Sequence, residues 1–218
     1  MKTLIQYILE SISSSELFGK LDIKEVKIDE NSKILDKDDN VKKFGIDNVD
    51  EIFLYKYSKH YQLIYDNECL GIFAVYDFNN YDKDFKNISN DDEEGQMNRY
   101  VICKFLCAPF ENPKFKFSDF LNNSIYVTYL LMLSDIQHKL DINATATIKV
   151  FFDKLKTFCK KLNKKYIIAN GKNQKTTALY SKCGNFKLYS DVLPGYKLKL
   201  LQSIDKNIVD TCVMYELK

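Results

Sequence analysis

The clearest pattern of hydrophobic and polar positions lies in the C-terminal part of the chain. Residues 125–133 form a nearly unbroken apolar run, which is typical of a strand buried on both faces. Apolar side chains then recur every three or four positions over residues 147–162, which predicts an amphipathic helix. A short apolar strand at 166–169 and a helix at 174–182 follow. This order predicts a right-handed crossover that makes the two strands parallel neighbours.

After the second helix, Gly184 stands where a left-handed residue commonly ends a helix. Three further apolar segments, residues 186–189, 195–201 and 211–217, have the composition of strands. Together these elements predict an α/β (α+β) fold, in which helices flank a mixed sheet with a parallel strand pair at its centre.

The N-terminal half has a less regular pattern. Residues 3–18 carry one apolar stripe and predict a helix that closes before Gly19. Residues 79–97 are dense in Asn and Asp, which predicts an exposed and mobile insertion. The strand-like segments are 23–28, 52–57, 61–65, 69–77 and 100–108, and those between 52 and 77 predict an antiparallel meander with a turn at 66–68.

The composition bears on the number of domains and on whether the protein binds nucleic acid. No segment rich in Pro, Gly or Ser divides the 218 residues, so we expect a single domain. The formal net charge is only +2, which disfavours a strongly basic surface for nucleic acid. Arg99 is the only arginine, and arginine makes the best bidentate contacts to phosphate and guanine. We therefore expect no sequence-specific nucleic-acid partner.

Cysteine usage and the first residues bear on compartment. The six cysteines are scattered without a CxxC pair, and the chain has two histidines, so we expect no structural zinc site. Most of the cysteines lie in apolar runs, where a free thiol behaves as a small hydrophobe, and a reducing cytoplasm is the expected location. Residues 1–12 are too polar for a signal peptide and too short to span a bilayer, so no membrane association is expected.

One stretch points to chemistry. Residues 165–186, KYIIANGKNQKTTALYSKCGNF, place Asn173 and Tyr180 seven positions apart between a strand and a glycine. Residues 178–186 are similar to the phrase A-x-Y-x-K-x-G-F, with Asn185 inserted before the aromatic residue. The segment 213–217, VMYEL, looks like a closing strand. These features, in this order, resemble the GNAT family of N-acyltransferases over about residues 125–218.

The resemblance implies an acyl-CoA-dependent N-acyltransferase that moves an acetyl group from acetyl-CoA to an amine acceptor, which the sequence does not identify. In that family Asn173 would contact the pantetheine arm, and Tyr180 would give a proton to the departing thiolate. Acyl transfer also needs a backbone N–H to polarise the carbonyl and a base to take the amine proton. A splayed pair of parallel strands, 125–133 beside 166–169, would supply the N–H groups. An ordinary interfacial tyrosine is the alternative for Tyr180, since the chain has 15 tyrosines.

The phosphate loop departs from the family pattern, Arg/Gln-x-x-Gly-x-Gly/Ala. Residues 141–148 occupy that place as DINATATI, without a glycine. Ala146 allows close approach and Thr145 or Thr147 offers a hydroxyl, so we take these residues, with Asn143, as the candidate cofactor-binding loop. Ile148 would crowd a phosphate there. The alternative is that Asn143 or Thr145 only caps the following helix.

Two residues after the central strand are candidates for the general base. Asp135 stands where these enzymes often place a carboxylate or a bound water, and His138 would titrate near neutral pH. The alternative for both is a solvated loop residue.

Two functions stay open at this point. The first is an acetyltransferase with an unusual pyrophosphate loop. The second is a GNAT-fold binding or structural protein without catalysis. The opening MKTLIQYILES is similar to those of many proteins of large tailed phages, and the Lys-, Asn- and Ile-rich usage suggests an AT-rich genome, so the second function includes a virion-associated role.

Overall fold

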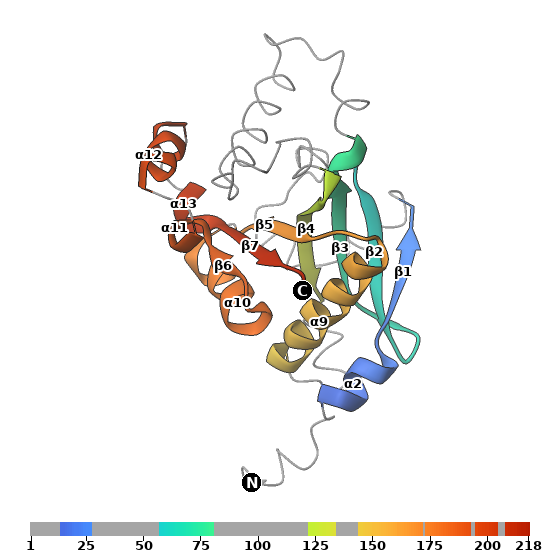
Figure 1. The fold of residues 1–218 in the computed structure, drawn as a ribbon. Helices are drawn as coiled ribbons and strands as arrows, with labels where there is room; N and C mark the ends of the chain where they lie inside the picture. The colour runs from blue at the N-terminus through green and yellow to red at the C-terminus, as the bar shows by residue number, and fades with distance from the viewer. Residues whose placement is uncertain are drawn as a thin grey trace, which may run out of the picture.

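The computed structural model describes residues 14–27, 57–80, 122–133, 144–171, 173–192, 195–204 and 208–218. These residues form an α+β fold on one mixed sheet with the strand order β1-β2-β3-β4-β5-β7-β6 (Figure 1). The strands are β1 (Asp22–Val26), β2 (Lys59–Tyr65), β3 (Glu68–Asp77), β4 (Ser124–Met132), β5 (Tyr166–Asn170), β6 (Lys187–Leu188) and β7 (Cys212–Glu216). The helices are α2 (Ser14–Lys20), η3 (Phe78–Asn80), α9 (Ala144–Lys161), α10 (Gln174–Gly184), α11 (Tyr189–Val192), α12 (Gly195–Ile204) and α13 (Ile208–Thr211). The predicted fold class is confirmed.

The first four strands form an antiparallel meander. Asp66 and Asn67 connect β2 to β3 with φ angles of 49° and 65°. A two-residue hairpin loop of type I′ needs two successive left-handed residues, and Asp and Asn tolerate this conformation. The predicted turn is confirmed, and β3 begins directly after it at Glu68.

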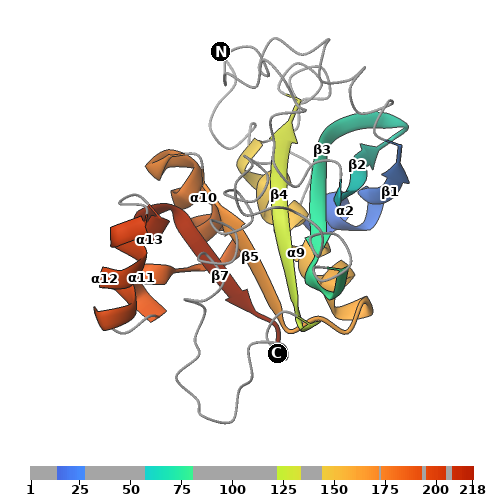
Figure 2. The same ribbon diagram turned by 90° about the horizontal axis from the view of Figure 1, so that it is seen from above.

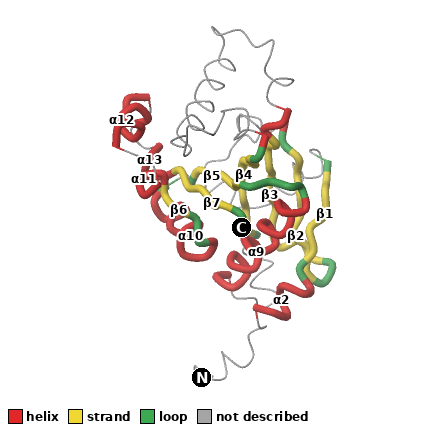
Figure 3. The backbone as a smooth tube through the Cα atoms, in the orientation of Figure 1, coloured by secondary structure: helices red, strands yellow, loops and turns green. Residues whose placement is uncertain are grey.

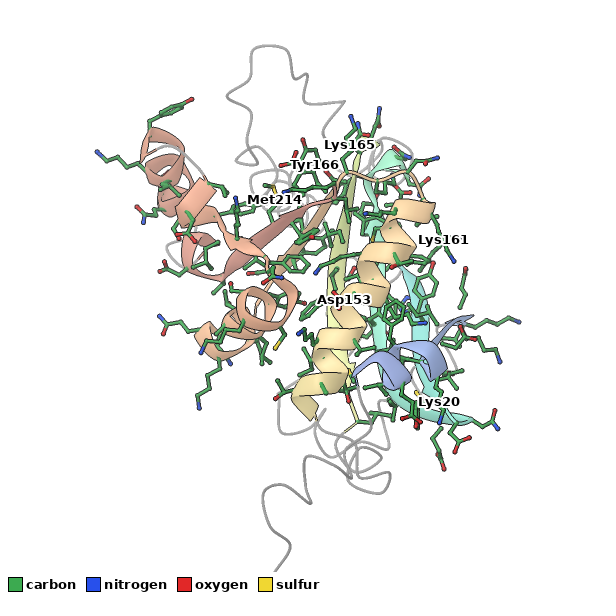
Figure 4. The ribbon with its side chains drawn as sticks, turned by 60° about the horizontal axis from the view of Figure 1, so that its bottom comes forward. Lys20, Asp153, Lys161, Lys165, Tyr166 and Met214 are labelled. Atoms are coloured by element: carbon green, nitrogen blue, oxygen red, sulfur yellow. The ribbon has the colours of Figure 1, made fainter. Side chains whose placement is uncertain are left out.

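The parallel strand pair is also present. β4 pairs with β5 in parallel from Ser124 opposite Tyr166 to Val127 opposite Ala169. Helix α9 connects the two strands, and Figure 4 shows Lys161 at its end and Lys165 and Tyr166 where β5 begins. The predicted crossover from strand through helix to parallel strand is therefore confirmed.

Aromatic packing fixes α9 on the sheet. Phe73 of β3 stacks on Tyr61 of β2 with ring centroids 5.1 Å apart, and Phe151 of α9 contacts the Phe73 ring edge-on at 5.1 Å. Phe158, seven positions later on the same stripe, meets Tyr61 edge-on at 5.0 Å. Figures 1 and 2 show α2 and α10 beside α9 on this face of the sheet. The apolar stripe that the 3.6-residue period places on α9 therefore packs on β2 and β3 through a row of aromatic contacts.

The C-terminal elements differ from the prediction. Residues 195–201 were expected to be a strand and instead belong to helix α12, while the strand expected at 186–189 is reduced to β6 and followed by α11. The apolar composition of this segment was misleading, because Tyr196 is 65% exposed rather than buried in a sheet. Lys, Leu and Gln, which dominate this segment, are good helix formers. Figure 3 shows α11, α12 and α13 gathered at the β6–β7 edge.

The end of α10 also differs from the prediction. Gly184 is the last helical residue, and Asn185 is the residue in the left-handed conformation, with φ 56° and ψ 31°. Gly184 is needed for close packing instead. A Cβ at this position would lie 2.7 Å from the Phe186 ring and 3.0 Å from the Phe152 ring.

At the other end of the chain, α2 continues through Gly19 to Lys20, where the sequence predicted that it would close before the glycine. Glycine only weakens a helix, and the Leu21 N–H still donates to the Leu17 carbonyl at 2.8 Å across this turn. Lys20 Nζ lies 2.7 Å from Glu16 Oε1, one turn earlier, and this pair stabilises the last turn.

Several predicted elements lie outside the described residues. They are most of the N-terminal helix, nearly all of the strand at 52–57, the strand at 100–108 and most of the insertion at 79–97, of which Asn79 and Asn80 end η3. Within the described part of the chain, no helix has the length and apolarity needed to cross a bilayer.

A buried ion pair joins distant segments at the edge of the sheet where β4 and β5 begin. The Lys164 side chain is only 2% exposed and pairs through Nζ with Asp77, whose side chain is 33% exposed. Lys164 Nζ also donates to the Asn122 carbonyl at 3.0 Å. A buried ammonium needs such partners, because an unpaired charge in the protein interior is strongly destabilising.

The two halves of this pair should differ in importance. We expect Asp77→Ala to lower the free energy of unfolding by about 3 kcal/mol, because it leaves the lysine buried without its carboxylate. Lys164→Met should cost less, about 1 kcal/mol, because water still reaches Asp77. Urea denaturation measures both values, and Glu25→Ala is the matched control because the Glu25–Lys59 pair is exposed. Equal losses for the two variants would contradict this account.

Candidate functional site

β4 and β5 separate after a short parallel start. Their register stops at Val127 opposite Ala169, while β4 continues in register with β3 as far as Met132. β5 instead follows β7, with which it pairs from Tyr166 to Asn170. Figure 2 shows the two strands starting together near the C-terminus and diverging toward their carboxyl ends. The splay that the sequence analysis expected between these strands is therefore present.

A β-bulge lies at the point of divergence. Val75 of β3 is opposite Val127 of β4, and Ala74 is opposite Tyr129, so Thr128 is an extra residue in β4. A bulge bends the strand that carries it and increases its local twist. The bend begins one residue after the last β4–β5 pair, which ties the divergence to a defined backbone irregularity.

Two helices begin at the same edge. Because α9 leads from β4 to its parallel neighbour β5, it starts at the carboxyl end of β4, and α10 starts after the carboxyl end of β5. Neither helix has an acidic residue in its first turn, and Lys175 in the first turn of α10 is exposed. A helix N-terminus carries partial positive charge, and its first backbone N–H groups have no partner within the helix. This edge of the sheet therefore favours binding of an anion.

The candidate phosphate loop is partly helical. Helix α9 begins at Ala144, three residues earlier than predicted, so Thr145, Ala146 and Thr147 belong to its first turn. Thr145 is exposed and Ala146 half-buried, whereas Thr147 is fully buried. Of the two candidate hydroxyls, only that of Thr145 lies on an exposed residue.

Asn173 is the N-cap of α10. Its Oδ1 accepts a hydrogen bond from the Thr176 backbone N–H at 3.0 Å, and Thr176 Oγ1 accepts one from the Asn173 N–H at 3.0 Å. This reciprocal pair is a capping box, whose sequence signal is the Asn-x-x-Thr spacing. Asn173 is exposed, and its amide nitrogen is a potential donor toward a ligand.

The turn from β5 into α10 is very tight. A Cβ on Gly171 would lie 2.2 Å from Thr177 Oγ1 and 2.7 Å from the Thr177 backbone nitrogen. The Gly171 N–H donates to the Thr211 carbonyl at 2.8 Å, and Thr177 Oγ1 donates to the Asn173 carbonyl at 2.9 Å. A glycine at position 171 therefore allows the first turn of α10 to pack directly against the end of β5.

Tyr180 lies in an aromatic cluster between α9 and α10. Its ring is 5.0 Å from that of Phe152 and 5.4 Å from that of Phe186, and the residue is 7% exposed. Burial raises the pKa of the Tyr180 phenol well above its ordinary value, so the hydroxyl keeps its proton at neutral pH. The residue is thus in the protonation state that an acid requires, and its ring also holds the two helices together.

The structure gathers part of the predicted site. Thr145, Ala146 and Thr147 open one helix, and Asn173 opens the other, at one edge of the sheet, while Tyr180 packs against α9 from within α10. Asp135, His138 and Asn143 lie outside the described residues, so their predicted roles stay predictions. No cluster of three or more His, Cys, Asp or Glu side chains suited to a metal occurs among the residues the structure describes.

Two features next to this site were not predicted from the sequence. The bulge at Thr128 has no signature in the apolar run of β4. His60, which forms a hydrogen bond with Tyr129, is buried on the face of β2 opposite to that of Tyr61, and one of only two histidines in the chain was the available signal.

Comparison with known proteins adds no assignment. No model of a known protein family matches this sequence, and no curated protein matches it.

Gly171 provides a test of the tight strand-to-helix turn. We expect Gly171→Ala to lower the free energy of unfolding by about 2 kcal/mol, because its methyl group meets backbone as well as side chain at Thr177. Gly19→Ala is the matched control. It lies inside α2 with open space around it, so it should leave stability unchanged or raise it by about 0.5–1 kcal/mol. Thermal and urea unfolding measure both, and a harmless Gly171→Ala would refute the tight turn.

Proposed function

We propose that this protein is a GNAT-like N-acetyltransferase that uses acetyl-CoA to acetylate an amine. One observation carries the proposal. The parallel strands β4 and β5 diverge after Val127 and Ala169, and α9 and α10 both begin at their carboxyl ends. In open α/β sheets, ligands bind outside the carboxyl ends of the parallel strands, at the point where the order of the strands in the sheet reverses.

The diverging strands β4 and β5 offer groups that could bind the thioester of acetyl-CoA. Backbone N–H groups of the segment Thr128–Met132 are our candidates to polarise the acetyl carbonyl, since β4 no longer follows β5 there. The first turn of α9, with Thr145 exposed, is the candidate contact for pyrophosphate. Asn173 at the start of α10 is the candidate contact for the pantetheine arm.

Tyr180 is our candidate acid. The amine nitrogen attacks the carbonyl carbon, the C–S bond breaks, and Tyr180 protonates the departing thiolate. A phenol with a raised pKa donates poorly to an ordinary thiolate. Burial raises thiol pKa values as well, however, as it does for Cys159 in this protein, to about 12. A thiolate leaving into the same dehydrated environment would therefore be basic enough to take the proton.

A non-catalytic binding protein with the same fold is the second candidate. The burial of Thr147 favours it, because that hydroxyl does not lie at the surface where a phosphate would approach. The loop before α9 also lacks the glycines that allow close approach to pyrophosphate.

Binding and turnover separate the two candidates. We expect acetyl-CoA to bind the wild type in titration calorimetry, and acetyl transfer to be detected with spermidine, a lysine-containing peptide or hydroxylamine. Tyr180→Phe should lower kcat by about 10² while leaving acetyl-CoA affinity and stability nearly unchanged, because the ring contacts remain.

Tyr61→Phe is the matched control, since Tyr61 is another buried tyrosine with a raised pKa but lies on β2. It should keep kcat within about twofold of the wild type. No binding of acetyl-CoA by the wild type would instead support the non-catalytic protein.

A further inference from the structure

A polar pair lies on the sheet face opposite α9 and α10. His60 of β2 and Tyr129 of β4 are both opposite Ala74 of β3, on its two sides. Because the Ala74 side chain is small, the two longer side chains meet above it, and Nδ1 of His60 lies 3.1 Å from the Tyr129 hydroxyl. Tyr61, the neighbour of His60, faces the core under α9, which places His60 on the other face.

The bulge in β4 allows a second polar contact, between Ser58 and Thr128, beside the His60–Tyr129 pair. Ser58 Oγ lies 2.7 Å from Thr128 Oγ1, so Ser58 and His60, two residues apart, contact successive residues of β4. Successive residues of a regular strand point to opposite faces. The extra residue at Thr128 therefore turns Thr128 and Tyr129 toward the same face, directly beyond the last β4–β5 pair.

The two members of the pair differ in exposure. His60 is an ionisable residue with only 2% exposure, whereas Tyr129 is half-buried. Tyr129 thus connects an enclosed imidazole to a less enclosed position on the diverging part of β4. Helices α9 and α10 pack together on one face of the diverging strands, so we take the opposite face, on which Tyr129 lies, as the side from which an amine would approach an acyl group held between β4 and β5.

We propose that Tyr129 and His60 form the proton-accepting pair of the acetyltransferase, with Tyr129 in contact with the attacking amine and His60 as the final acceptor. This inference rests on the proposed function and identifies its base. It extends a site whose base was expected only at residues 135 and 138.

The proton balance is simple. As the amine nitrogen forms its bond to the carbonyl carbon and the C–S bond breaks, the nitrogen gives one proton to the Tyr129 oxygen. The Tyr129 hydroxyl proton passes to Nδ1 of His60, and the thiolate receives one proton from Tyr180. Solvent returns Tyr180 and His60 to their starting states, so the net products are one amide and one thiol.

The relay requires a particular histidine tautomer. Nδ1 must be an acceptor in the resting protein, with hydrogen on Nε2. The chain has only two histidines, so ¹⁵N-histidine spectra of the whole protein are simple to assign, and signals absent from His60→Asn belong to His60. We expect the Nε2–H tautomer for His60. A resting Nδ1–H tautomer would overturn the proposal, whatever the acceptor amine is.

Kinetics test the role of the pair. His60→Asn keeps an oxygen that accepts from Tyr129 but cannot take the proton, so kcat for spermidine, the lysine-containing peptide or hydroxylamine should fall about 10²-fold. Tyr129→Phe should cause a similar fall, and the double variant should be no slower than either single variant, because both act on one proton path. Acetyl-CoA affinity, measured by calorimetry, should change by less than about threefold in all of them.

Ser58→Ala is the matched control, since it removes the neighbouring hydrogen bond on the same face. It should keep kcat within about threefold of the wild type. Equal losses of kcat in Ser58→Ala and His60→Asn, or a loss in the double variant equal to the product of the single losses, would show that these side chains only hold the strands in place. Either result would overturn the proton relay from Tyr129 to His60. Full activity of His60→Asn would overturn the relay alone and leave the acetyltransferase standing. A wild type that fails to bind acetyl-CoA, or transfers acetyl to none of the three amines, would overturn both.

Discussion

Strand β4 pairs with β3 over most of its length but with β5 only over its first residues. The candidate site depends on the point where the β4–β5 pairing ends. Along β3 its register continues to Met132, whereas along β5 it stops at Val127. Hydrogen-bonded strands keep a fixed spacing, so β5 separates from β4 only where their ladder ends. The bulge at Thr128 lies at that end, and the bend it introduces both opens the strand pair and turns Tyr129 to the face of His60.

The aromatic cluster between α9 and α10 sets the position of the two helix starts relative to each other. Phe152, Tyr180 and Phe186 lie within 5.0 to 5.4 Å of one another, centroid to centroid. Gly184 allows this approach, because a side chain there would collide with two of the rings. Such close packing transmits displacement rather than absorbing it. A change in this cluster would therefore also move the edge proposed to bind phosphate.

Sequence alone predicted the parts of the fold that rest on local patterns. The apolar run of β4, the stripe of α9 and the short β5 led to the parallel pair, and Asp66-Asn67 led to the hairpin turn. The prediction for the α12 segment was wrong because its apolar composition fits a strand, while helix propensity and tertiary context favour a helix. Of the site, Asn173 is the N-cap of α10 and Tyr180 lies within that helix, and their chemical roles stay predictions. The bulge and the His60–Tyr129 contact depend on pairing across β3, which no local pattern encodes.

The place of β7 in the sheet has a consequence for how the chain folds as it is made. β7 lies between β5 and β6 and pairs with both, although it follows them in sequence. Until residues 212–216 leave the ribosome, β5 has β4 on one side and an open row of backbone donors and acceptors on the other. Such an edge is a template for pairing with another chain. If β4 and β5 pair during synthesis, a strand of the sheet interior is for that time its edge, and slow synthesis of the α11–α13 region would prolong that exposure.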